Sequence, residues 1–200
     1  DMSTYLQGLR QVCDDNGWLL MLDEVQSGIG RTGTWFAFQH TGIVPDVMSL
    51  AKGLGSGVPI GACVAKGVAA DVFVYGKHGS TFGGNPLATA AGLTTLNAIQ
   101  DEKLRENAQK MGDLICDGFK AELANTKGVV IIRHAGLMVG IELDRPCADL
   151  VKIALSAKLL INVTADNVIR LLPPLVINAE ESQALVSRLS GLIKEFLQNK

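Results

Sequence analysis

Three short apolar runs, each bounded by glycine, proline or charged residues, constrain the fold of this chain most strongly. They occupy residues 18–22, 47–51 and 60–65 and indicate short buried strands. Apolar residues at helical spacing predict a helix over residues 2–16, and a proline start rich in Ala and Leu predicts another over residues 86–99. Because strands and helices alternate, we expect an α/β fold with a mostly parallel sheet and flanking helices.

The pattern changes after Asp101, where a long amphipathic helix begins. Short strands and two further helices are expected beyond it, with strands at residues 129–133, 137–143, 160–163 and 168–172 and helices at residues 148–158 and from 179 onward. We therefore predict two domains, residues 1–100 and an α+β domain over residues 101–200. The chain opens on a helix that earlier strands would normally precede, so we expect a further half upstream.

Composition excludes several classes of function. The chain is 48% hydrophobic and 19% charged, with a formal net charge of -2 and no block of like charges. This balance argues against a nucleic-acid or membrane-surface partner, and no apolar run approaches the length of a bilayer span. The four cysteines and three histidines are scattered, so we expect no metal site and a cytoplasmic protein.

The stretch "LMLDEVQSGIGRTG" contains a literal G-x-G-x-x-G at Gly28, Gly30 and Gly33. A dinucleotide-binding turn needs its first glycine directly after the strand and a helix directly after the turn. Here residues 23–27, two of them acidic, intervene, and too few residues follow for a crossover helix. A nucleotide-binding oxidoreductase is therefore disfavoured, and the glycines more readily allow a sharp loop beside a site.

Asp23 and Lys52 follow two of the predicted strands directly. Ligands of open α/β sheets bind outside the carboxyl ends of the strands, so these side chains could face one crevice. Lys52 has apolar and glycine neighbours, and a lysine amine in such a setting can form a Schiff base with an aldehyde. On spacing alone, a surface lysine after a strand is an equally good interpretation.

Several long motifs, in register, resemble one family. "LMLDEVQSGIGRTGTWFAFQHTGIVPDVMSLAKGLGSGVPIGACVA", "HGSTFGGNP" and "NVIRLLPPL" are similar to the class III, ornithine-type, pyridoxal-phosphate aminotransferases. The resemblance covers essentially the whole chain and aligns it with the C-terminal half of that family. It implies part of the large cofactor-binding domain in residues 1–100 and the small C-terminal domain in residues 101–200.

The resemblance also implies roles for residues of the first domain. Asp23 matches the carboxylate that pairs with the pyridine nitrogen of pyridoxal 5'-phosphate and keeps it protonated. Gln26 matches the side chain that contacts the phenolic oxygen of the cofactor. Lys52 matches the Schiff-base lysine, which would also carry the proton during catalysis.

Three more residues take their roles from the same resemblance. Thr81 matches the hydroxyl that binds the phosphate of the cofactor held by the other subunit, with Ser80 as a weaker candidate, so the complete site would need a homodimer. Arg170 lies in an apolar stretch and matches the guanidinium that binds the substrate carboxylate. A buried salt bridge to an Asp or Glu is the alternative for Arg170. Glu24 and Arg31, in the first motif, are expected to order the loop.

Within the family, "LINVTADNVIRLLPPL" and "HGSTFGGNPLATAAG" most resemble members that act on N2-acetyl-L-ornithine. This implies transfer of its terminal amino group to 2-oxoglutarate, which yields glutamate, as in arginine biosynthesis. Succinylornithine, succinyl-diaminopimelate, ornithine and 4-aminobutyrate are alternative amino donors. The remaining phosphate contacts and the ring-stacking aromatic belong to the N-terminal half of the family. An inactive fragment that serves as a dimerisation module therefore stays a second hypothesis.

Overall fold

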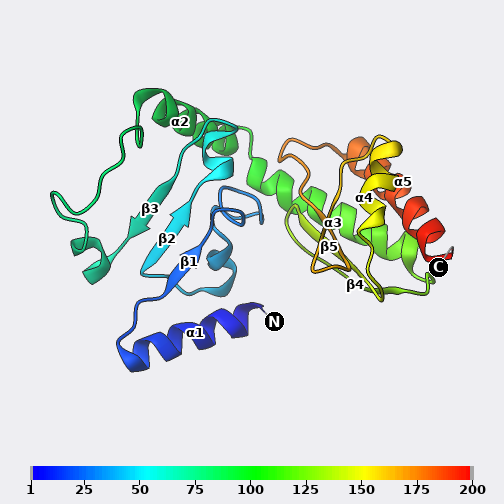
Figure 1. Cartoon of the computed structure of the whole chain (residues 1–200), viewed down its shortest axis with the longest axis horizontal. Coiled ribbons are helices and arrows are strands. Elements are labelled where there is room, and N and C mark those ends of the chain that lie inside the picture. The colour runs from blue at the N-terminus through cyan, green and yellow to red at the C-terminus, as the bar shows by residue number, and fades with distance from the viewer. Residues whose placement is uncertain (1, 199–200) are drawn as a thin grey trace. The chain divides into compact units, whose positions relative to one another are not determined.

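The computed structural model describes residues 2–198 and divides the chain into two compact units, Asp1–Arg105 and Glu106–Lys200 (Figure 1). The positions of the two units relative to each other are not determined. The assignment of residues 1–100 and 101–200 to the two domains of a longer enzyme stays a prediction.

The first unit contains a three-stranded sheet with helices and short 3-10 helices around it. Asn85 begins helix α2 by accepting a hydrogen bond from the N–H of Ala88 at 3.0 Å, and a proline follows at the first helical position, where it needs no donor. The elements are α1 (Met2–Asn16), β1 (Met21–Asp23), η1 (Ala37–Thr41), β2 (Val47–Leu50), η2 (Lys52–Gly55), β3 (Ala62–Ala65), η3 (Gly67–Asp71) and α2 (Pro86–Asp101).

The strand order is β1-β2-β3, with β1 parallel and β3 antiparallel to the central strand β2. The expectation of a mostly parallel sheet is therefore correct for only one of the two pairings in the described residues. A parallel neighbour requires a crossover of a dozen or more residues, usually through a helix. Residues 51–61 contain only the short η2, so the chain turns back beside β2.

Two further expectations for this sheet are corrected. The first strand covers Met21–Asp23 rather than residues 18–22, because Trp18 still donates its N–H to the carbonyl of Cys13 at the end of α1. The strands are also less buried than their apolar sequences indicate. Met21 is 68% exposed and Val64 is 44% exposed, so apolar faces of this sheet remain uncovered within this chain.

The second unit is a four-stranded antiparallel sheet with three helices. Its strands follow the order β4-β5-β7-β6, and every pairing is antiparallel. The predicted elements are present, with ends shifted by a few residues. The elements are α3 (Leu104–Leu123), β4 (Val129–Ala135), β5 (Met138–Leu143), α4 (Asp149–Ser156), β6 (Asn162–Thr164), β7 (Val168–Leu171) and α5 (Ala179–Gln198).

One face of the second sheet forms the core with the helices (Figure 1). Along β5, Val139, Ile141 and Leu143 are buried, while the residues between them are partly exposed, as the two-residue period of a strand requires. Helix α3 contributes Ile115 and Phe119 to the same core, both with no exposed surface. In residues 2–198 no helix combines the length and the apolarity that a bilayer crossing needs.

Candidate functional site at the carboxyl ends of β1 and β2

Asp23 is the last residue of β1 and lies directly opposite Ser49 of β2 in the parallel register. Its Oδ1 accepts hydrogen bonds from the N–H of Val25 at 2.9 Å and from the hydroxyl of Ser49 at 3.3 Å. No residue of the described chain donates to Oδ2, and the side chain is exposed. One oxygen of this carboxylate is thus held while the other remains available.

Lys52 begins η2 two residues beyond the end of β2 and has an exposed side chain. Its backbone is left-handed, with φ of 45°, a conformation that is uncommon for a residue with a side chain. Strain of this kind persists where the surroundings impose it, and it is concentrated at functional sites. Helix α2 packs against η2, since a β-carbon at Gly92 would lie 3.6 Å from the carbonyl oxygen of Leu54.

The loops that follow β1 and β2 are in contact. A β-carbon at Gly53 would lie 3.7 Å from the β-carbon of Ile29, which is 4% exposed. The N–H of Glu24 also donates to the carbonyl oxygen of Ser49 at 3.0 Å. The structure therefore brings the acid and the amine that the sequence singles out to the same edge of one sheet, at the ends of neighbouring parallel strands.

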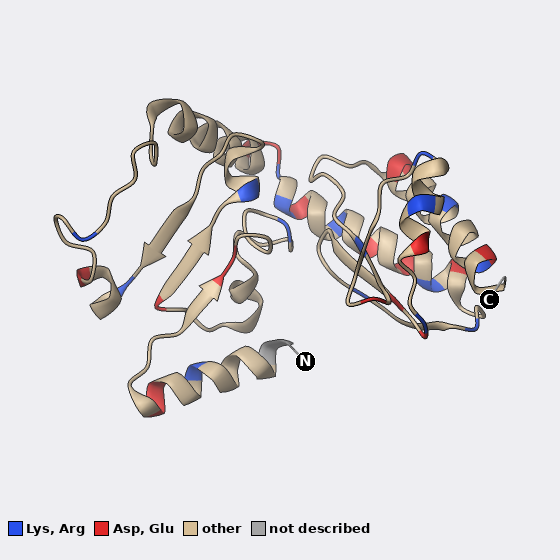
Figure 2. Ribbon diagram, viewed as in Figure 1, with Lys and Arg blue, Asp and Glu red and all other residues tan. Residues whose placement is uncertain are grey.

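Charge in this sheet is confined to the strand ends (Figure 2). Strands β2 and β3 contain no charged residue, whereas Asp46 precedes β2 and Lys66 follows β3. Asp46 accepts hydrogen bonds from the guanidinium of Arg10 on α1 at 2.6 Å and from the N–H of Leu20 at 2.8 Å. These two donors hold the pKa of the Asp46 carboxyl below its usual value.

Glu24 orders the loop next to Asp23, in agreement with the role that the sequence indicates for it. It is only 2% exposed, and its carboxylate accepts hydrogen bonds from the N–H groups of Ala37 at 3.1 Å and Phe38 at 2.9 Å. The hydroxyl of Ser27 donates to the same carboxylate at 2.6 Å. A buried charge is tolerable here because three donors and the N-terminal end of η1 satisfy it.

The glycines of the G-x-G-x-x-G stretch shape this loop and do not open a helix. Gly30 and Gly33 have φ of 85° and 89°, and a β-carbon at Gly28 would lie 2.8 Å from the carbonyl oxygen of Glu24. Consecutive turns follow, and the next helical element is the short η1. The stretch therefore lacks the helix N-terminus that a dinucleotide pyrophosphate requires. Gln26 lies partly buried within the same loop.

Ser80 and Thr81 lie in an exposed segment before α2. The hydroxyl of Ser80 accepts a hydrogen bond from the N–H of Gly83 at 3.0 Å, which closes a local turn. In the described residues no interaction joins Ser80 or Thr81 to Asp23 or Lys52. Their part in a phosphate site stays a prediction.

Arg170 lies on β7 in the second unit, between Asn162 of β6 and Gly140 of β5. Its neighbours Ile169 and Leu171 are buried in the core, so Arg170 points to the opposite face of the sheet. Arg170 belongs to the second unit and Lys52 to the first, so a shared site for these two residues stays a prediction.

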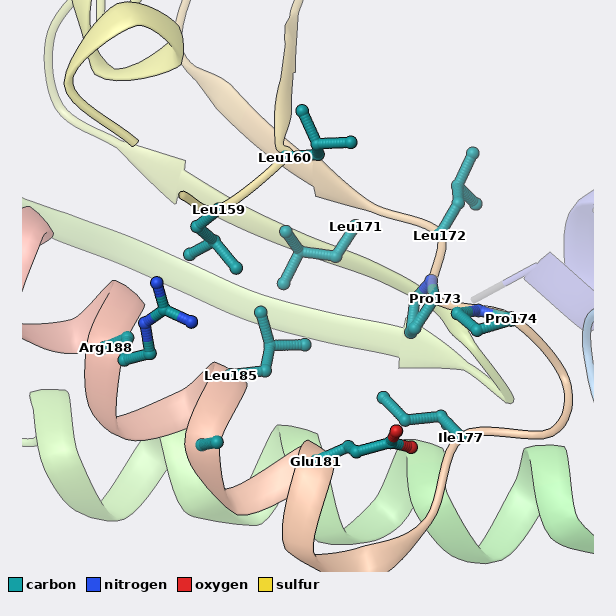
Figure 3. Close-up of a pocket in the computed structure, with 11 residues that line it drawn as sticks. Leu159, Leu160, Leu171, Leu172, Pro173, Pro174, Ile177, Glu181, Leu185 and Arg188 are labelled. Carbon is teal, nitrogen blue, oxygen red and sulfur yellow. The ribbon is translucent and has the colours of Figure 1, made fainter. Parts of the chain in front are cut away.

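A groove of about 480 Å³ lies beyond β7 in the second unit (Figure 3). Its lining is mainly leucine and proline, with two charged side chains, Glu181 and Arg188. Glu181 accepts a hydrogen bond from the N–H of Asn178 at 3.0 Å, and Arg188 donates to the carbonyl oxygens of Ala157 and Lys158. Glu181 thus caps the start of α5 and Arg188 caps the end of α4, and the lining of the groove contains no candidate catalytic group.

Ser49, which binds Asp23 directly, was not singled out by sequence reasoning. It is a polar residue within the otherwise apolar strand "VMSL", and this interruption was the only signal in the sequence. Recognising its role requires the pairing of Ser49 with Asp23, which local patterns do not reveal.

Comparison with known families and proteins provides an independent line of information. The family model Aminotransferase class-III matches residues 2–193. The chain is 55% identical, over 198 residues, to an acetylornithine aminotransferase of Nitrosomonas europaea, covering 99% of this chain and 50% of that protein. It is 58% identical, over 193 residues, to acetylornithine aminotransferase 1 of Bordetella pertussis, covering 96% of this chain and 49% of that protein.

Solved structures agree with this match. The ornithine aminotransferase of Toxoplasma gondii superimposes with a TM-score of 0.91 at 34% identity, over 98% of this chain and 48% of that one. The acetylornithine aminotransferase of Elizabethkingia anophelis superimposes with a TM-score of 0.84 at 37% identity, over 93% of this chain and 48% of that one. The chain thus spans about half the length of the curated relatives that it matches.

Proposed function

Because this chain belongs to the class-III aminotransferases, we propose that it forms part of an enzyme that transfers the terminal amino group of N2-acetyl-L-ornithine to 2-oxoglutarate. The proposed cofactor is pyridoxal 5'-phosphate. The proposal rests most directly on the identities of 55% and 58% to proteins named as acetylornithine aminotransferases. Arginine biosynthesis in the cytoplasm is the corresponding cellular role.

The chemistry of the groups at the strand ends fits this cofactor. The cofactor has a basic pyridine nitrogen, which an acid can bind, and an aldehyde, which an amine can bind covalently. A site for it therefore needs both groups on one surface. Asp23 offers a carboxylate oxygen to which no described residue donates, and Lys52 offers an exposed amine at the end of the adjacent parallel strand. This juxtaposition is the structural observation that supports the proposal.

When bound, pyridoxal 5'-phosphate supplies a carbonyl that takes up amino groups and a ring that accepts electrons from the substrate. Asp23 would hold a proton on the ring nitrogen through a charge-assisted hydrogen bond. The amine of Lys52 would anchor the cofactor covalently and then move a proton at the reacting carbon. Gln26 would contact the phenolic oxygen, and Glu24 keeps their common loop in place.

Two further roles belong to the proposal. Arg170 would bind the carboxylate of 2-oxoglutarate and of the amino donor, since a planar guanidinium fits a carboxylate in two hydrogen bonds. Thr81, with Ser80 beside it, would bind the phosphate of a cofactor held by a second copy of the chain. Exposed apolar side chains near these hydroxyls, among them Tyr75 at 106% and Phe82 at 81%, favour a homodimer.

Borohydride reduction of the intact protein tests the chemistry. If Lys52 anchors the cofactor, the protein is yellow as purified, borohydride bleaches it, and peptide mapping finds the label on Lys52. A label on another lysine overturns the lysine assignment. A colourless protein that takes up no added cofactor supports an inactive dimerisation module instead.

Competing amino donors test the substrate. We expect kcat/KM of the intact protein to be highest for N2-acetyl-L-ornithine among the five donors considered, the others being succinylornithine, succinyl-diaminopimelate, ornithine and 4-aminobutyrate. A clear preference for 4-aminobutyrate would contradict the assignment while leaving the aminotransferase chemistry intact.

A further inference from the structure

We propose that Ser49 is a positioning residue that fixes the orientation of the Asp23 carboxylate, so that one chosen oxygen faces the cofactor nitrogen. This inference deepens the proposed function and rests on it. It assigns a task to a hydroxyl that neither the family match nor the motifs single out.

The contacts of Asp23 carry the inference. Both of its hydrogen bonds, from Ser49 at 3.3 Å and from the N–H of Val25 at 2.9 Å, end on Oδ1. Within residues 2–198 neither these donors nor any other reaches Oδ2. The two carboxylate oxygens, chemically equivalent in a free aspartate, are therefore distinguished by their surroundings.

Strand register explains why the hydroxyl must come from this position. Ser49 and Asp23 are direct partners in the parallel pair, so their side chains stand on the same face of the sheet. The other residues of β2, Val47, Met48 and Leu50, have no side-chain donor. The bond from Val25 comes from the backbone, so among the residues that the structure describes Ser49 supplies the one side-chain contact that a substitution can remove.

Orientation matters because Asp23 is exposed at a strand end, where an aspartate side chain rotates easily. A carboxylate held on one oxygen presents the other in a constant direction and loses less rotational freedom when a ligand binds. The hydroxyl would therefore strengthen the hydrogen bond between Asp23 and a protonated ring nitrogen without touching the cofactor.

The matched pair S49T and S49V in the intact protein tests this inference, because threonine and valine share a shape and differ by the hydroxyl. The main measurement is the dissociation constant of pyridoxal 5'-phosphate, from absorbance titration of the cofactor-free protein. We expect S49V to weaken binding by about three- to tenfold, the usual net worth of a single intramolecular hydrogen bond, and S49T to restore it.

The D23N background separates a positioning role from a general effect on the fold. If Ser49 acts through the Asp23 carboxylate, S49V in the D23N protein changes the dissociation constant by less than twofold. Thermal unfolding of the cofactor-free variants checks that they remain folded. Equal affinity for S49T and S49V, or a full S49V effect in the D23N background, overturns the inference and leaves the proposed function standing. Failure of the wild type to bind the cofactor overturns both.

Discussion

The buried carboxylate of Glu24 accepts a hydrogen bond from the backbone N–H of Ala37, thirteen residues later, at 3.1 Å. The same carboxylate also holds Phe38 and Ser27. This one side chain therefore closes the whole loop that follows β1. The loop carries Gln26 and begins beside Asp23, so its order is a condition for the proposed site.

Replacement of Glu24 should destabilise the protein. We expect E24A to lower the free energy of unfolding by about 2–3 kcal/mol, because it leaves buried N–H groups without an acceptor. E24Q should lose less, since its amide oxygen can still accept. Urea denaturation measures both. The control is Q39A, whose side chain accepts only an exposed bond from Phe36, and a loss for Q39A as large as for E24A would contradict this explanation.

Replacement by alanine should change the free energy of unfolding in opposite directions at two helical glycines. A β-carbon at Gly112 in α3 would lie 2.0 Å from the carbonyl oxygen of Gly136, so G112A should cost about 3 kcal/mol through overpacking. Nothing lies within 4 Å of a β-carbon at Gly191 in α5, so G191A should stabilise the helix by about 0.5–1 kcal/mol. Unfolding curves of the two variants should shift in opposite directions, and a shared direction would refute the packing argument.

The ion pair between Arg10 and Asp46 should give a pH-dependent contribution to stability. The bond from Arg10, with that from Leu20, lowers the pKa of the Asp46 carboxyl in the folded state. Such a contribution is fully present above the unfolded pKa of about 3.9 and is lost as the pH falls through the lowered folded value.

The variant D46N tests whether this stabilisation is lost as the pH falls. Its free energy of unfolding should lie below that of the wild type at pH 7, and the difference should shrink steadily below pH 4. A difference that stays constant down to the lowest accessible pH would show that the charge of Asp46 contributes nothing. The R10Q variant should show the same convergence, because it removes the other half of the pair.

Arg170 and Arg133 offer a matched test of carboxylate binding. Both pair with Gly140 of β5, Arg170 from β7 on one side and Arg133 from β4 on the other. Arg133 forms an ion pair with Glu142 at 2.7 Å. We expect R170K in the intact protein to raise KM for 2-oxoglutarate about tenfold, since an ammonium cannot make the paired bonds of a guanidinium.

Cofactor affinity should not change in R170K, and R133K should leave KM within about twofold of the wild type, because an exposed ion pair contributes little. Steady-state kinetics with varied 2-oxoglutarate distinguishes these outcomes. An unchanged KM for R170K would remove Arg170 from the substrate site and favour a purely structural ion pair.

Much of the architecture was predictable because the sequence signals of a helix, its apolar spacing and its end residues, lie within the helix segment itself. The apolar spacing in α1 and α3 and the proline start of α2 placed these helices within a few residues of their observed bounds. Because Asp23 and Lys52 each follow a predicted strand, the sequence also predicted that they would share one edge of a sheet. The parallel pairing of β1 with β2 bears this out.

Other features did not follow from the apolar patterns alone. The apolar run of β3 looks the same whether the strand is parallel or antiparallel, and only the short connection through residues 51–61 decides its direction. The same runs indicated buried strands, yet Met21 and Val64 are exposed, because burial depends on layers that local sequence does not supply.

The sequence by itself determined the type and order of the elements and the placement of an acid and an amine directly at strand ends, since hydrophobic period and turn residues act over a few positions. Tertiary structure alone decided that Ser49 faces Asp23 and that Glu24 closes a loop thirteen residues long. These contacts join residues distant in the chain, and their geometry exists only once the strands have paired and the loops have packed.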